Sequence, residues 1–136
     1  MKIISETASI QAPISVVFEF LSQAHNIECL LPDDKISDFH SDKNGCTFKV
    51  QGGFLISLLY VDKEEPTLIR MKSGEKAPFS YSLTIHLSED DDQTNGHIEF
   101  IGNVNMFLKI MVEKPLIGLF NHMSAKLQEQ FYIGKT

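Results

Sequence analysis

The order of apolar and polar positions divides the chain into a short helical region near its start, a long run of strands and a helical end. Residues 2–10 (KIISETASI) alternate with a period of two, which predicts a first strand. Pro13 stands where a helix can begin, and the apolar spacing after it predicts a short helix over residues 13–23. A second short helix, around His25–Leu31, is expected to stop at Pro32, because proline disfavours helical geometry in the residue before it.

From Asp33 onward the period changes to two, which predicts six further strands joined by tight turns. The predicted strands are Ile36–His40, Cys46–Gln51, Phe54–Asp62, Leu68–Ser73, Ser80–Ser88 and His97–Asn103. The predicted turns are Asn44-Gly45, Gly52-Gly53, Glu65-Pro66 and Asn95-Gly96. The clearest alternation lies in Ser80–Ser88, whose predicted core face consists of Tyr81, Leu83, Ile85 and Leu87.

The last quarter of the chain, Asn105–Tyr132, has the spacing of an amphipathic helix. Its apolar stripe consists of Leu116, Phe120, Met123, Leu127 and Phe131, at steps of four, three, four and four residues. Pro115 interrupts this pattern, and proline ends or kinks a helix. The pattern therefore predicts a short lead-in helix over residues 105–113, then a main helix with Pro115 in its first turn.

These elements predict an α+β domain with the order β-α-α-β6-α, spanning residues 1–136 as a single domain. Short turns make the six later strands antiparallel neighbours, and the first strand joins one edge. A seven-stranded antiparallel sheet twists and curls. We expect the long C-terminal helix to pack in its concave side.

Composition narrows the possible partners. The formal net charge is −6 and the pI is near 5.3, which argues against general nucleic-acid binding and against an electrostatic attachment to anionic membranes. No apolar run approaches the length of a membrane span, and the first residues lack a signal-peptide pattern. Cys29 and Cys46 are too few for a disulfide scaffold, so we interpret them as buried, reduced thiols of a cytoplasmic protein.

Three segments resemble the START/Bet v 1-like superfamily (SRPBCC), especially its bacterial branch of polyketide cyclase/dehydrase and lipid transport proteins. They are APISVVFEFLSQ at 12–23, CTFKVQGGFLISLLYVDKEEP at 46–66 and NMFLKIMVEKPLIGLFNHMSAKLQEQF at 105–131. The resemblance covers essentially the whole chain and implies a helix-grip fold. Members bind lipids, sterols, plant hormones or polyketides between sheet and helix, and some catalyse cyclisation or dehydration there. The chain contains no recognisable catalytic motif of a characterised branch.

The resemblance favours binding of a small hydrophobic or amphipathic molecule, such as a lipid or polyketide, between the sheet and the C-terminal helix. The predicted ligand-binding residues are Phe48, Tyr60, Met71, Tyr81, Leu83, Ile85, Phe100, Phe107, Met111, Phe120, Met123 and Leu127. Residues 106–114 (MFLKIMVEK) are more apolar than a surface turn needs, so we expect them to form a movable lip where the ligand enters. We expect a small apolar molecule as partner, with no cofactor, nucleic acid or stable membrane insertion.

The sequence is also compatible with two other functions. One is an enzyme of the cyclase/dehydratase type that uses Tyr60, Tyr81 or His122 as proton donors in the same cavity. It requires at least two titratable groups within reach of each other inside the cavity. The other is a protein-interaction domain with a filled core. A helical histidine such as His122 lies more often on the solvent side than in a pocket.

Two possible metal sites are weak. His25, Glu28 and Cys29 share a helical face by spacing, but no second cluster of ligands lies nearby in the sequence. The acidic run Glu89–Asp92 fits the calcium-loop pattern at too few positions and is typical of a solvated hairpin tip. We therefore expect no metal.

Overall fold

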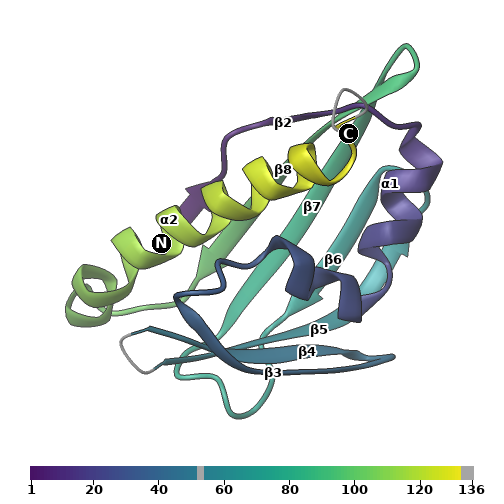
Figure 1. Cartoon of the computed structure of the whole chain (residues 1–136). Helices are drawn as coiled ribbons and strands as arrows, with labels where there is room; N and C mark the ends of the chain where they lie inside the picture. Colours follow the sequence, from purple (N-terminus) through teal and green to yellow (C-terminus); the bar gives the residue numbers. More distant parts are fainter. Residues whose placement is uncertain (52–53, 133–136) are drawn as a thin grey trace.

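The computed structural model describes residues 1–51 and 54–132, and its elements follow the predicted order (Figure 1). The predicted turn at Gly52-Gly53 lies outside the described residues. The strands are β1 (Lys2–Ile4), β2 (Ala8–Ile10), β3 (Ile36–Asp42), β4 (Gly45–Val50), β5 (Phe54–Glu64), β6 (Leu68–Lys72), β7 (Tyr81–Asp90) and β8 (Gln93–Gly102). The helices are α1 (Ile14–Leu21), the 3₁₀ helix η1 (Ala24–Leu30) and α2 (Met106–Gln130).

The strands form one antiparallel sheet in the order β1-β8-β7-β6-β5-β4-β3, with β2 also paired to β8. The predicted α+β helix-grip arrangement is therefore confirmed. The prediction of one strand over residues 2–10 is wrong, because this segment makes two short strands. Ser5 breaks the ladder: its side-chain oxygen accepts a hydrogen bond from the Ile98 amide at 2.8 Å, and its own amide donates to the Ile98 carbonyl at 2.9 Å.

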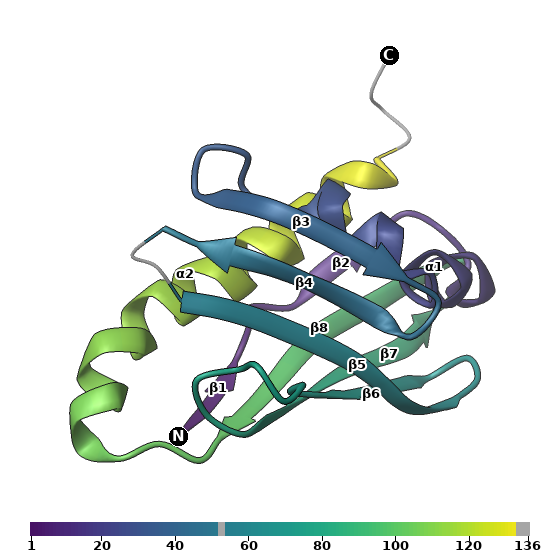
Figure 2. The same cartoon turned by 90° about the horizontal axis from the view of Figure 1, so that it is seen from below.

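Helix α2 lies across the concave face of the sheet, and the curvature of the sheet around it is clear from below (Figure 2). Four residues of the predicted stripe are buried against the sheet: Leu116, Phe120, Met123 and Leu127. The fifth, Phe131, is half-buried and meets the ring of Phe20 edge-on, at 5.3 Å between centroids. The 3.6-residue spacing thus identified the face of the helix that packs on the core.

The predicted break at Pro115 is wrong, because α2 runs without interruption from Met106 to Gln130. Proline lacks the amide that would donate to the carbonyl of residue 111, four positions earlier. Both Pro115 and Met111 are solvent-exposed, so water can reach the carbonyl left without an intrahelical donor. Asn105 caps the start of the helix by accepting a hydrogen bond from the Leu108 amide at 2.8 Å.

The predicted hairpin at Asn95-Gly96 is also wrong. Strands β7 and β8 pair from Asp90 and Gln93, so the turn consists of Asp91 and Asp92, and Asp91 takes a positive φ of 56°. Gly96 lies inside β8, where a Cβ atom would come within 2.9 Å of a Leu87 methyl group. The glycine therefore serves close packing between strands and not a turn.

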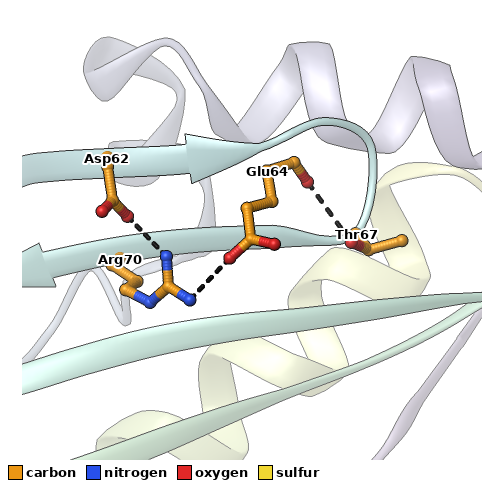
Figure 3. A network of polar contacts seen from close by, with 4 residues as sticks. All are labelled: Asp62, Glu64, Thr67 and Arg70. Carbon is orange, nitrogen blue, oxygen red and sulfur yellow. Dashed lines mark hydrogen bonds and ion pairs between the residues drawn. The ribbon is translucent and has the colours of Figure 1, made fainter.

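The β5–β6 hairpin carries a polar network on the exposed side of the sheet (Figure 3). The guanidinium of Arg70 contacts Asp62 at 2.8 Å and Glu64 at 2.6 Å, and Thr67 donates to the Glu64 carbonyl at 3.3 Å. Exposed ion pairs of this kind contribute little to stability. They order a hairpin that makes no part of the candidate site described below.

Candidate ligand-binding site

The interior between sheet and helix is almost filled. The void there measures about 30 Å³, and its lining includes five of the predicted ligand-binding residues: Met71, Leu83, Ile85, Met123 and Leu127. That volume has room for one or two waters, whereas pockets that hold small molecules measure roughly 300–1,000 Å³. These five residues therefore do lie together, around a space too small for a ligand.

Three more of the predicted residues are rings that fill the core. Phe48 and Phe100 are completely buried, and Phe120 is nearly so. The ring of Phe100 lies 5.0 Å from that of Phe120 and 5.1 Å from that of Tyr81, which is contact distance for aromatic pairs. In this conformation no ligand can reach between them.

The Tyr81 hydroxyl of β7 is bound to the backbone of β5, which lies beyond β6 in the sheet. It accepts a hydrogen bond from the Ser57 amide at 2.8 Å and donates to the Ser57 carbonyl at 2.9 Å. Strand β6 ends at Lys72, which pairs with Leu59, so the phenol replaces the missing partner of Ser57 along β5. Burial raises the pKa of Tyr81 to about 12, which keeps the hydroxyl protonated at neutral pH.

The Tyr60 hydroxyl is likewise engaged. It donates to the Leu21 carbonyl at 2.8 Å and so ties the end of α1 to β5. Burial, with a smaller effect of the Cys46 thiol, raises the pKa of Tyr60 above its usual value. Both tyrosines thus use their hydroxyls to hold the fold together.

The larger cavities lie on the flanks of α2 near Pro115. The first, here called the basic recess, measures about 320 Å³, and its lining includes Lys35, Val50, Lys114, Gly118, Leu119 and His122. The second, here called the apolar recess, measures about 380 Å³, and its lining includes Phe54, Phe79, Leu108, Met111 and Val112. Gln51 and Pro115 line both, so the two recesses adjoin. Each is large enough for a small ligand.

The side chain of His122 faces the basic recess. Its Nε2 atom is buried and has no hydrogen-bond partner among the described residues. A buried polar atom without a partner costs about 1–3 kcal/mol. His122 is the one predicted proton donor that lines either recess. A helical histidine is expected more often on the solvent side of its helix, whereas His122 is half-buried beside this recess.

The second half of α2 is held to the N-terminal segment by three hydrogen bonds. The Glu6 amide donates to Asn121 Oδ1 at 2.8 Å, Ser124 donates to the Glu6 carbonyl at 2.7 Å, and the Ser9 amide donates to Gln128 Oε1 at 3.0 Å. Within the described residues, the polar side-chain contacts of 106–115 stay inside the helix and its cap: Asn105 with Leu108, and Lys109 with Glu113 at 3.9 Å.

The first turns of α2 expose large apolar side chains. Met106, Phe107, Ile110 and Met111 are between 57% and 75% exposed. Met111 lines the apolar recess, while Phe107 lines neither recess. The segment predicted as a movable lip therefore has an apolar face without a partner in the described chain. Among the described residues, no helix combines the length and apolar composition that a membrane crossing needs.

The residues considered for a metal do not converge. His25, Glu28 and Cys29 are all exposed on η1, so the predicted burial of the Cys29 thiol is wrong. A 3₁₀ helix has three residues per turn, so Cys29 does not share a face with His25 as an α-helix would have allowed. Asp91 and Asp92 form the exposed β7–β8 turn. The described residues contain no group of three His, Cys, Asp or Glu side chains placed to hold a metal.

Sequence reasoning missed the residues that make the recesses polar. Lys35 precedes β3, Gln51 follows β4 and Lys114 lies in α2, so no spacing rule connects them. Only the sheet order, which places the ends of β3 and β4 beside α2, brings them together. The exposed glycine in the middle of α2, Gly118, was the one local signal, because glycine is unfavourable in a helix.

No family model matches the sequence, and a comparison with curated protein sequences gives no match. Solved structures do match. The protein XoxI from Bacillus cereus is 14% identical with a TM-score of 0.74, covering 96% of this chain and 94% of that one. A point mutant of norcoclaurine synthase from Thalictrum flavum, in complex with a transition-state analogue, is 15% identical with a TM-score of 0.73, covering 100% and 98%.

A START superfamily protein from Mycobacterium smegmatis is 10% identical with a TM-score of 0.67, covering 96% of each chain. At these identities the likeness shows the fold and nothing finer. Each alignment spans nearly the full length of both chains, so the likeness concerns the fold as a whole. The chain therefore has the START/Bet v 1-like helix-grip fold that its sequence resembles.

Proposed function

We propose that the protein binds a small amphipathic or hydrophobic molecule at the end of the grip where the two recesses adjoin. The observation that carries the proposal is this pair of cavities, about 320 and 380 Å³, beside the exposed apolar turns of α2. The free energy of binding would come from apolar area removed from water, at roughly 25 cal/mol per Å². Val50, Leu119 and Met111 would cover the ligand.

The interior residues predicted from the sequence take part only if α2 moves. Met71, Leu83 and Ile85 surround a void of about 30 Å³, so a ligand reaches them only after the helix shifts away from the sheet. The first half of α2 is the part able to move, because its polar contacts stay inside the helix and its cap. This gives the predicted lip a physical basis within the proposal.

Binding is a better proposal than catalysis. The cyclase/dehydratase alternative needs two titratable groups in one cavity, and the hydroxyls of Tyr60 and Tyr81 are bound to backbone groups elsewhere. His122 lines the basic recess together with Lys35 and Lys114. These three side chains can bind a charged group as readily as they could transfer a proton. The filled interior agrees with the third alternative, a protein-interaction domain, but that alternative gives no role to the recesses.

Gly118 offers a direct test. It lines the basic recess, and a Cβ atom added there would meet nothing within 4 Å. Gly118→Leu therefore places a bulky side chain in the recess without a clash, and it should stabilise the helix because glycine is unfavourable there by roughly 0.5–1 kcal/mol. Ala125→Leu, at an exposed position of the same helix, is the matched control.

The measurement is binding of the apolar dye Nile red and its displacement by 1-dodecanol, followed by fluorescence. We expect the native protein and Ala125→Leu to bind alike and Gly118→Leu to bind at least tenfold more weakly while unfolding no earlier. Equal binding by all three would exclude the recess as the site. No binding by the native protein would reject the proposed function itself.

Two free cysteines, Cys29 and Cys46, support the expectation of a cytoplasmic protein.

A further inference from the structure

We propose that the bound molecule carries an anionic head group, which Lys35, Lys114 and His122 hold in the basic recess. The inference rests on the proposed function and adds the chemical class of the ligand. A carboxylate and a phosphate monoester share the required chemistry, since both present negatively charged oxygen atoms to amine and imidazole donors. The test below distinguishes these two sources.

The charge of the recess is opposite to that of the protein. The chain has 18 acidic and 12 basic residues, yet the lining of the basic recess contains two lysines and no carboxylate. Asp33, Asp34 and Glu113 are sequence neighbours of these lysines, but none of them lines the recess. An anion bound there would meet an attractive local field despite the net charge of −6.

Neither lysine of the recess is neutralised from within the chain. Among the described residues, the side chains of Lys35 and Lys114 have no ion-pair or hydrogen-bond partner. Four other lysines do contact carboxylates: Lys2, Lys49, Lys109 and Lys126. The backbone of Lys35 is nevertheless fixed, because its amide donates to the Pro32 carbonyl at 3.1 Å and its carbonyl accepts from the Gln51 amide at 2.8 Å.

The helix presents its side of the recess through a regular spacing. Lys114, Gly118 and His122 are four residues apart, so they lie along one face of α2. Gly118 leaves the space between the amine and the imidazole open. Any larger residue would fill it, which gives a reason for a glycine inside a helix where glycine is otherwise unfavourable.

The third donor is the buried nitrogen of His122. Its Nε2 atom has no hydrogen-bond partner among the described residues although it is closed off from solvent. A turn of the imidazole toward the recess would let an anionic oxygen supply the partner, whether the imidazole is neutral with its proton on Nε2 or fully protonated. Val50 and Leu119, both buried, provide apolar wall beside these donors, so the ligand is expected to be an amphiphile and not a free ion.

The experiment compares three twelve-carbon probes that differ only in the head group: dodecanoate, dodecyl phosphate and 1-dodecanol. Each displaces Nile red from the native protein and from the double variant Lys35→Met/Lys114→Met, below the concentration at which the probes form micelles. The matched control is Lys43→Met/Lys76→Met, which removes two exposed lysines outside both recesses. We expect the site variant to lose about tenfold in affinity for the anionic probes and less than about twofold for dodecanol.

The outcomes separate the two levels of the proposal. If the native protein binds dodecanol as tightly as both anions and the site variant binds all three probes unchanged, the proposal of an anionic head group is wrong. The proposed function would still hold in that case. Native protein that binds none of the probes overturns both. Preference for dodecanoate or for dodecyl phosphate identifies the source, and His122→Phe should weaken binding of the preferred anion more than binding of dodecanol.

Discussion

The two halves of α2 each contain six large apolar residues but have opposite surroundings. Residues 116–130, here called the closed half, bury Leu116, Phe120, Met123 and Leu127 against the sheet and are bound to the N-terminal segment by three hydrogen bonds. Residues 106–115, here called the open half, are richer in large apolar residues, with six in ten positions against six in fifteen, but bury only Val112. The apolar recess borders the open half, and the basic recess lies at the junction, lined by Lys114 and Pro115 of the open half and by Gly118, Leu119 and His122 of the closed half. The interior void of about 30 Å³ borders the closed half.

The difference shows that apolar content alone does not decide burial. The closed half lies over the concave sheet and beside η1, whereas the open half continues past that packed region toward the end of the sheet (Figures 1 and 2). An apolar face without a partner is unusual for a folded monomer and often marks a binding site. We interpret the closed half as the part that holds the fold, and the open half together with the junction at Pro115 as the part that meets the ligand.

The largest expected effect comes from deleting one phenylalanine in each half. Phe120→Ala should lower the free energy of unfolding by about 3–5 kcal/mol, because it leaves a cavity in a filled core. Phe107→Ala removes a ring that is 70% exposed and should change the free energy of unfolding by less than about 0.5 kcal/mol. Urea unfolding of both variants measures the difference. Similar losses would contradict the division of the helix into two halves.

Removing the proline between the halves should have the next largest effect. Pro115→Ala supplies the missing amide to the Met111 carbonyl, and proline is about 3 kcal/mol less favourable than alanine inside a helix. We expect a gain in stability of about 1–3 kcal/mol, measured as a higher thermal midpoint. We also expect weaker binding of Nile red by the same variant, since Pro115 lines both recesses. A loss of stability would show that the ring is needed for packing.

The two buried tyrosines should differ in a predictable way. Tyr81→Phe leaves the amide and the carbonyl of Ser57 without their partner, which should cost about 1–3 kcal/mol. Tyr60→Phe removes one hydrogen bond to the Leu21 carbonyl and should cost about 1 kcal/mol. Neither change should alter ligand affinity, because neither residue lines a recess. A loss of binding with unchanged stability would instead favour the catalytic alternative.

The smallest expected effect is a pH dependence from the exposed face of the sheet. Burial, with a smaller contribution from the positive charge of His86, lowers the pKa of His97 below its usual value near 6.5. The rings stack at 4.8 Å, and His86 also contacts Glu99 at 3.1 Å. The folded protein resists protonation of His97, so the contribution of the neutral ring to the free energy of unfolding is complete above about pH 6.5. That contribution is lost as the pH falls.

His97→Gln should therefore lose less stability than the native protein between about pH 7 and pH 5, as measured by urea unfolding at each pH. The difference should be small because His97 is partly solvated. Ligand binding should be unaffected by this substitution, since His97 lines neither recess. A change in dye affinity would show that the two faces of the sheet are coupled, contrary to the account above.

The fold could be predicted because its signals are local or periodic. Alternation identified the buried face of β7, and the four-and-three spacing after Pro115 identified the buried face of α2. The errors occurred where tertiary structure overrides a local rule. Asn95-Gly96 has the composition of a turn but packs under Leu87, and Pro115 is tolerated because its surroundings are open to water.

The candidate site was only partly predictable. The exposed apolar face at the start of α2, including Met111, could be predicted from the excess of apolar residues there. The predicted interior residues, in contrast, surround a nearly filled core. Lys35 and Lys114 are 79 positions apart in the sequence. No pattern in one sequence indicates that two such residues share a recess, because their proximity depends on the sheet order and on where α2 crosses it.

We propose that ligands bind where the two recesses meet at Pro115 and not in the interior void, and amide chemical shifts distinguish these two places. In a titration of ¹⁵N-labelled protein with dodecanoate, we predict the largest shift changes at Lys35, Gln51, Lys114, Gly118 and His122. The residues around the interior void, Met71, Leu83 and Ile85, should change little at the first equivalent. Shift changes centred on those three residues, with the basic recess unaffected, would contradict the account.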